Sequence, residues 1–110
     1  SARAELYRTM LDFHARYDLL MTPTMPITAL EVGRIAPAQG PYGRDWLDWS
    51  PYTYPFNLTQ QPAASIPCGM ASDSLPIGVQ VIGARGADSL VLQAARALER
   101  VLLFAQPKTN

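Results

Sequence analysis

Few side chains in this sequence could act as a nucleophile or a general base. The chain has one histidine, His14, one cysteine, Cys68, and one lysine, Lys108. Hydrolysis at a serine needs a histidine or lysine beside the hydroxyl. Lys108 lies close to the last residue, and no G-x-S-x-G turn is present. We therefore expect no catalytic residue in this chain and interpret His14 as an ordinary residue on a helix face.

Cys68 also lacks the surroundings of a reactive thiol. A cysteine nucleophile needs a nearby cation or a helix N-terminus to stabilise its thiolate. No Lys, Arg or His lies within ten residues of Cys68, which follows the apolar pair Ile66-Pro67. We expect this side chain to fill space as a small buried residue.

Metal and cofactor chemistry have as little support. One histidine and one cysteine cannot supply the three or four ligands of a zinc site, and the carboxylates are scattered. Gly78, Gly83 and Gly86 lie in or after an apolar stretch but form neither G-x-G-x-x-G nor a P-loop. We expect no metal and no cofactor.

Apolar periodicity predicts an α/β chain, in the order helix, strand, long loop, helical turn, two strands and helix. The helices are expected at 2–17 and 89–103, and a short one near Ser50-Pro51. The strands are expected at 18–24, 63–66 and 77–82. Consecutive apolar residues in the first strand indicate burial on both faces.

Each long helix is expected to bury one apolar stripe. The first stripe consists of Leu6, Met10, Phe13 and Tyr17. The second, in a helix capped by Asp88, consists of Leu90, Ala94, Leu98 and Val101 or Leu102.

The loop at about residues 22–56 is rich in proline and aromatic residues. It holds six of the ten prolines and six of the ten aromatic residues. Trp46, Trp49, Tyr52 and Tyr54 could line a pocket for an apolar or aromatic small molecule. They could equally hold a long loop against the domain, and the sequence leaves both interpretations open.

Composition narrows the class of partner and compartment. Nine basic and nine acidic residues balance, so electrostatics do not recruit nucleic acid or an anionic membrane. No apolar run approaches the roughly 20 residues of a membrane span. A single cysteine suits a reducing cytoplasm. We expect residues 1–110 to form one unit whose opening is cut from something longer.

Three segments in order resemble the C-terminal portion of the amidase signature family. They are YDLLMTPTMP at 17–26, TYPFNLTQQPAASIPCG at 53–69 and LPIGVQVIGARGADSLVLQAARALE at 75–99. The family carries D-x-L-x-x-P-T, then T-x-P-x-N-x-x-G-x-P and P-x-G, then G-[LV]-Q-[LI]-[IV]-G before a closing helix. The matching residues are Asp18, Leu20, Pro23, Thr24, Thr53, Pro55, Asn57, Pro62, Pro67, Gly69, Gly78, Gln80 and Gly83.

The resemblance implies a mixed sheet covered by helices, within the C-terminal segment of an amide-hydrolysing enzyme. The family's nucleophilic serine, second serine in a cis peptide and lysine belong to an earlier region that nothing in this chain matches. A small-molecule amide would be the parent's substrate. The alternatives are a segment of an amidotransferase A-type subunit, or a stand-alone binding and assembly module.

The resemblance also suggests which residues border the substrate. The variable loop contributes to a cleft wall in the family, which makes Trp46, Trp49 and Tyr54 candidates. Gln60 is a fourth candidate, because it stands where the family usually has glycine. Its side chain implies either an ordinary backbone angle at that turn or a reach outward into the cleft.

The stretch 57–70, NLTQQPAASIPCGM, is then scaffold. We expect Asn57 to hydrogen-bond backbone, Pro62 to fix the entry angle, and Pro67 to end strand pairing because it lacks an N–H. Gly69 would permit a backbone angle that other residues resist. A piece of a larger sheet should also expose apolar surface, so we expect the chain to self-associate.

Overall fold

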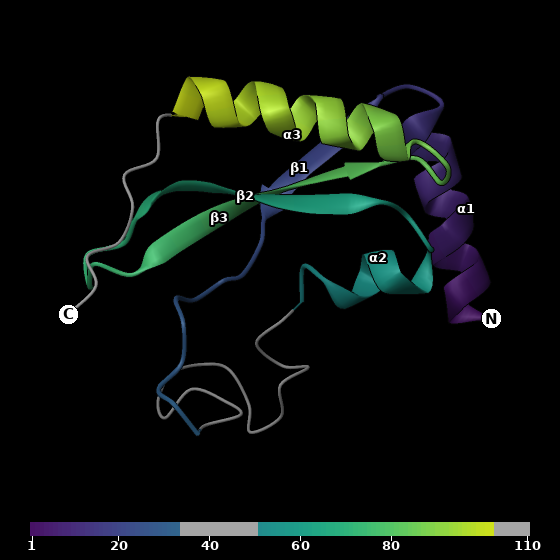
Figure 1. Ribbon diagram of the computed structural model, residues 1–110. Helices are drawn as coiled ribbons and strands as arrows, with labels where there is room; N and C mark the ends of the chain where they lie inside the picture. The colour runs from purple at the N-terminus through teal and green to yellow at the C-terminus, as the bar shows by residue number, and fades with distance from the viewer. Residues whose placement is uncertain (34–50, 103–110) are drawn as a thin grey trace.

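The protein is described by a computed structural model over residues 1–33 and 51–102. Its elements are α1 (Ala2–His14), β1 (Leu19–Pro23), α2 (Tyr54–Leu58), β2 (Ala63–Met70), β3 (Pro76–Gly83) and α3 (Asp88–Leu102). The strands form an antiparallel sheet in the order β1-β3-β2. Figure 1 shows α3 lying along one face of the sheet, while α1 stands beside the end where β1 begins. The expected α/β class is confirmed.

The β2–β3 hairpin is longer than its sequence predicts. Pro67 does not end the pairing: it lies opposite Gly78, and β2 continues to Met70. A register shift between Pro67 and Gly69 places Cys68 in a bulge, which allows a residue without an N–H to sit inside the strand. Gly69 has φ 154°, an angle that favours glycine, as expected.

The hairpin turn is fixed by hydrogen bonds. Ala71 N–H donates to the Leu75 carbonyl at 2.8 Å, and Ser74 takes a left-handed φ of 65°. The Asp73 carboxylate accepts from the Thr28 hydroxyl at 2.8 Å and from the Leu75 N–H at 3.1 Å. Both hydrogen bonds lower the pKa of Asp73 below its ordinary value, and the bond from Thr28 has the larger effect. Asp73 therefore ties the segment after β1 to the hairpin.

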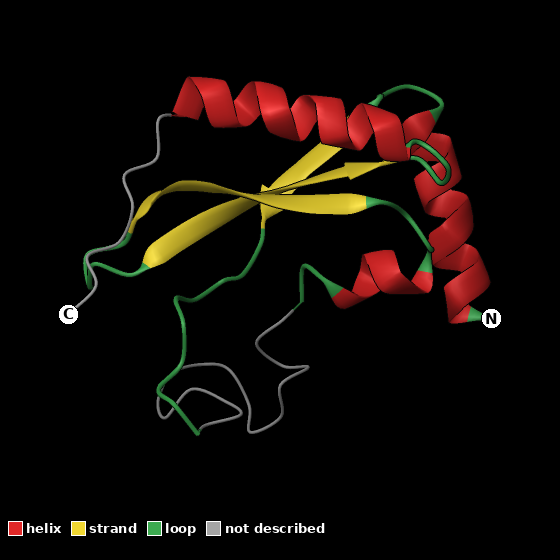
Figure 2. Ribbon diagram, in the orientation of Figure 1, coloured by secondary structure: helices red, strands yellow, loops and turns green. Residues whose placement is uncertain are grey.

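Most of the buried apolar core lies between α3 and the sheet, while Ile82 is buried on the opposite face. Side chains alternate between faces along a strand, and Val81, Ile66 and Gly83 share the face that α3 covers. Val91 of α3 is buried against this face, so the helix stripe runs through Val91. Of the expected stripe, Ala94, Leu98 and Leu102 are half-buried, whereas Leu90 and Val101 are exposed. Figure 2 shows this helix lying over one face of the strands.

The first half of the chain is less buried than its sequence predicts. Helix α1 ends at His14 and not at residue 17, and it has no fully buried residue. Tyr17 is 58% exposed. Strand β1 is not buried on both faces, because Met21 is 53% exposed. It is also an edge of the described sheet.

The short helix also lies later than expected. Thr53 occupies the N-cap position of α2 and Pro55 stands in its first turn, where a missing N–H costs no helical bond. The predicted start near Ser50-Pro51 is therefore wrong. The motif residues of 53–62 instead form this helix and its end.

Candidate pocket beside Gln60

Helix α2 ends in a hydrogen-bonding pattern that requires a left-handed residue. The Gln61 N–H donates to the Phe56 carbonyl at 3.1 Å, and the Gln60 N–H donates to the Asn57 carbonyl at 3.3 Å. This is the Schellman motif, and Gln60 occupies its C′ position with φ 58°. Asn57 does bond backbone here, but through its own carbonyl; no side-chain bond of Asn57 occurs among the described residues.

Gln60 thus keeps the backbone angle for which glycine is suited. A left-handed angle costs a residue with a Cβ about 1–2 kcal/mol. Of the two alternatives for Gln60, the ordinary backbone angle is therefore wrong. Its side chain is exposed and lines a surface pocket.

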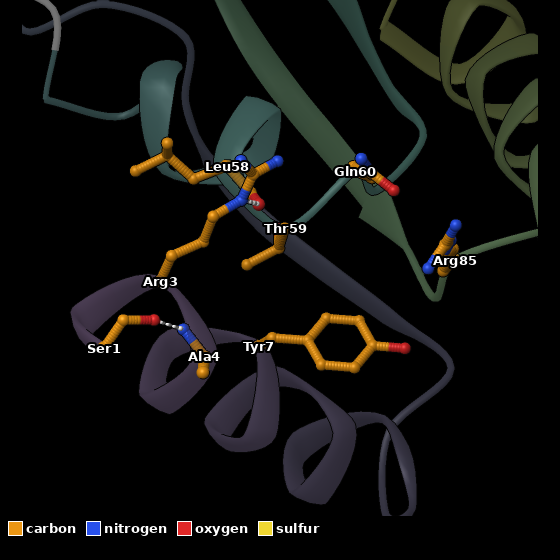
Figure 3. A pocket seen from close by; sticks show the side chains of 8 residues that line it. All are labelled: Ser1, Arg3, Ala4, Tyr7, Leu58, Thr59, Gln60 and Arg85. Atoms are coloured by element: carbon orange, nitrogen blue, oxygen red, sulfur yellow. Dashed lines mark hydrogen bonds between the residues drawn. The ribbon is translucent and has the colours of Figure 1, made fainter.

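The pocket lies between α1, the end of α2 and the turn after β3. Its volume is about 440 Å³, and it is open to solvent. Figure 3 shows Arg3 and Arg85 at opposite ends in this view, with the ring of Tyr7 between them. The lining consists of Ser1, Arg3, Ala4, Tyr7, Leu58, Thr59, Gln60 and Arg85. Sequence patterns gave no sign of this grouping, because its members come from three separate segments.

Beneath the pocket, a polar network joins α1 to the sheet. The Thr59 side chain is 1% exposed, and its hydroxyl donates to Gln61 Oε1 at 2.7 Å. Gln61 Nε2 then has two neighbours, the Gly83 carbonyl at 3.0 Å and His14 Nε2 at 2.9 Å. His14 Nδ1 lies 3.0 Å from the Tyr17 carbonyl, which only accepts. A neutral ring therefore donates from Nδ1 and accepts from Gln61 at Nε2.

This network gives His14 a structural role. Both of its ring nitrogens are engaged with groups that position α1, and no serine hydroxyl is among their partners. Neither Thr59 nor Gln61 was singled out from the sequence. The only signal for Gln61 is its place directly after the helix end, where a side chain can bond the neighbouring strand.

A second polar cluster lies on the sheet face opposite α3. Gln80 is 6% exposed, and its Nε2 donates to Thr22 Oγ1 at 3.1 Å and to the Tyr52 carbonyl at 2.8 Å. The Thr24 and Ser65 hydroxyls are 2.7 Å apart. A Cβ on Gly78 would lie 2.8 Å from the Ser65 Oγ. Gln80 therefore links β1 to the segment before α2, and Gly78 leaves room for the Ser65 hydroxyl.

The remaining motif residues lie around these clusters. The Pro62 carbonyl accepts from the Gly83 N–H at 3.0 Å, where β2 begins. Cys68 is half-buried, and its Sγ lies 3.7 Å from the Ile77 carbonyl. Pro23 ends β1 opposite Val79.

The predicted cleft residues do not gather in one place. Tyr54 is the first residue of α2, is 37% exposed and does not line the pocket beside Gln60. Trp46 and Trp49 lie outside the described residues. Within residues 1–33 and 51–102, no three His, Cys, Asp or Glu side chains could together hold a metal ion. No helix in those ranges is both long and apolar enough to cross a membrane.

Comparison with known proteins identifies the family. The amidase family model matches residues 1–92. The chain belongs to the amidase signature family. It is 41% identical over 98 residues to the 6-aminohexanoate-cyclic-dimer hydrolase of Paenarthrobacter ureafaciens, covering 82% of this chain and 20% of that enzyme. It is 44% identical over 86 residues to the A-type subunit of the Glutamyl-tRNA(Gln) amidotransferase of Thermotoga maritima, covering 78% of this chain and 17% of that protein.

The amidase fold is equally clear in three dimensions. The crystal structure of the Thermotoga maritima A-type subunit superposes with a TM-score of 0.81 at 35% identity, covering 98% of this chain and 24% of that one. The structure of 6-aminohexanoate cyclic dimer hydrolase gives 0.77 at 34% identity, covering 96% of this chain and 24% of that enzyme. The chain thus spans no more than about a quarter of the length of these relatives.

Proposed function

We propose that this chain is the C-terminal segment of an amidase, an enzyme that hydrolyses a carbon–nitrogen amide bond. The observation that supports this most is membership of the amidase family in a chain that spans 20% of a cyclic-amide hydrolase. The nucleophilic serine, the second serine in a cis peptide and the lysine would lie in the larger part of the enzyme. Within the described residues, His14 is committed to structural hydrogen bonds, which fits that division.

The segment would act as scaffold and as part of the substrate cleft. Its strands and α3 would complete a larger mixed sheet. Gln60 and Tyr54, which are exposed at the two ends of α2, would lie nearest to the substrate among the described residues. Trp46 and Trp49 would complete the wall. The single cysteine suits a cytoplasmic location for the parent.

Activity of the chain and of its natural gene product tests this proposal. The 110-residue chain should release no amine from an aryl acylamide. If the gene encodes a longer polypeptide, that polypeptide should release it, and a serine-directed inhibitor should stop the reaction. Turnover by the 110 residues alone, abolished by the same inhibitor, would contradict the proposal that the catalytic residues lie in the larger part of the enzyme.

An amidotransferase A-type subunit is the second candidate. It is favoured by the 44% identity and the TM-score of 0.81 to such a protein. That parent would release ammonia from glutamine and would need partner subunits to transfer it. Ammonia release from glutamine but not from simple acylamides would select this candidate.

A third possibility is a stand-alone binding and assembly module. The mass of the native gene product, measured with an antibody against this chain, discriminates it. A product of about 12 kDa, the mass of these residues, would favour the module. A product several times heavier favours the enzyme segment.

We also propose that the isolated chain self-associates. The fully buried apolar residues of the described ranges are Ile66, Val81, Ile82 and Val91 alone, while Met21, Ile77 and Leu92 are at least 42% exposed. So much apolar surface beside an edge strand favours pairing with another copy. Sedimentation should show a dimer or larger species, and a clean compact monomer would contradict this.

A further inference from the structure

The pocket beside Gln60 carries positive charge that the described residues do not neutralise. Arg3 and Arg85 both line it, and both are exposed. No carboxylate of the described residues forms an ion pair with either guanidinium. The other polar side chains that line it, Ser1, Tyr7, Thr59 and Gln60, are uncharged and carry hydrogen-bond donors. The charged side chains that line the pocket are therefore all positive.

Arg3 is held in place by the end of α2. Its Nε donates to the Leu58 carbonyl at 2.8 Å, which satisfies one of the carbonyls left free at a helix C-terminus. The two terminal amino groups of Arg3 have no partner among the described residues. A guanidinium fixed through Nε keeps these two groups available, so less side-chain entropy is lost when a ligand binds them.

Gln60 is held over the same pocket at a cost in backbone energy. Its left-handed φ of 58° would suit glycine better, yet the side chain is present and faces the pocket. A strained backbone with an exposed polar side chain is a feature that functional sites often have. Arg3, Gln60, Tyr7 and Arg85 thus surround one hollow of about 440 Å³, which is large enough for a small organic ligand.

We propose that this pocket binds a carboxylate, with Arg3 and Arg85 as its charged contacts and Gln60 and Tyr7 as neutral donors. A carboxylate suits the planar guanidinium, because it can accept two parallel N–H bonds from it. In Figure 3 the two arginines stand at opposite ends of the pocket. A ligand with a carboxylate at each end, such as glutarate, should therefore bind better than acetate. This site does not depend on the proposed amide-hydrolysing activity.

The carboxylate has two possible sources. It is either a free small molecule or an Asp or Glu side chain from another part of the same polypeptide. The natural gene product containing this sequence is the material for the test, since any such side chain is then present. The variants are Arg3→Gln and Arg85→Gln, and the matched control is Arg8→Gln, an exposed arginine of α1 that does not line the pocket.

Titration calorimetry with glutarate and acetate tests the free-ligand source. The wild type and Arg8→Gln should bind glutarate, and each pocket variant should weaken binding about three- to tenfold, since the sites are partly screened by water. Acetate should bind more weakly. Binding should fall as sodium chloride rises.

Thermal unfolding tests the internal source. If glutarate does not bind the wild type, Arg85→Gln should lower the unfolding temperature relative to Arg8→Gln, and 1 M salt should abolish that difference. Arg85 is the informative position because it has no other hydrogen bond among the described residues. The proposal is overturned if the wild type binds no glutarate and Arg85→Gln also causes no salt-sensitive loss of stability.

Discussion

Val91 of α3 occupies the space above Gly83 that a side chain would need. A Cβ on Gly83 would lie 2.7 Å from Val91 Cγ2 and 3.4 Å from Ala87 Cβ. The last residue of β3 is therefore small because the helix rests directly on its backbone. This contact gives a packing reason for the glycine at the end of the family motif. Any larger side chain there would push α3 away from β3, and these two elements enclose much of the core.

The first prediction concerns this contact. Gly83→Ala should lower the free energy of unfolding by about 1–3 kcal/mol, because the added methyl group forces the helix away from the strand. Urea denaturation measures it. In the double variant with Val91→Ala, the new methyl group should fill the space that the shortened valine leaves. The sum of the two single-variant losses in the free energy of unfolding should then exceed the loss measured for the double variant by at least about 0.5 kcal/mol.

The second prediction concerns the helix end at Gln60. Gln60→Gly should raise the free energy of unfolding by up to about 1 kcal/mol, because relief of the left-handed strain exceeds the added freedom of the unfolded chain. Gln60→Ala is the matched control, since it removes the amide but keeps the Cβ. Equal stability of the glycine and alanine variants would show that φ 58° carries no strain. The Gln60→Gly variant of the complete enzyme should also change substrate preference or rate.

The third prediction concerns the network under the pocket. Gln61→Ala should cost about 1–3 kcal/mol, because the Gly83 carbonyl and the buried Thr59 hydroxyl both lose a partner. Gln93→Ala, at an exposed position of α3, is the control and should change stability little. A double-mutant cycle of Gln61→Ala with His14→Ala should show coupling, and strictly additive losses would rule out the bond between them.

The fourth prediction concerns pH. The folded pKa of Asp73 lies below its unfolded value of about 3.8, so its bonds stabilise the fold above that value. This contribution should be lost as pH falls from 3.8 through the folded pKa. Asp73→Asn should therefore be less stable than the wild type at pH 7, and the difference should shrink at pH 3. Thr28→Val should show the same trend, because it removes the bond with the largest effect.

The sequence by itself determined the order and type of the elements. Leu19, Leu20 and Met21 form a strand, 77–82 another, and the apolar period after Asp88 a helix, because these patterns depend on local backbone preference. Motif spacing also gave the amidase family, which the comparisons confirm. The sequence marked Gly78 and Gly83 as motif positions. It did not show which neighbouring residues leave no room for a larger side chain there.

Only the tertiary structure decided boundaries, burial and the grouping of polar residues. Pro67 stays inside β2 because the strand is bulged there and does not need its N–H for pairing. The bulge is set by the register with the partner strand β3. Val91, not Leu90, is buried because the sheet fixes the rotation of α3. Gln60, Arg3 and Arg85 meet in one pocket because the Schellman turn and the end of β3 face the first turns of α1. Such contacts join residues far apart in the chain, and local patterns carry no record of them.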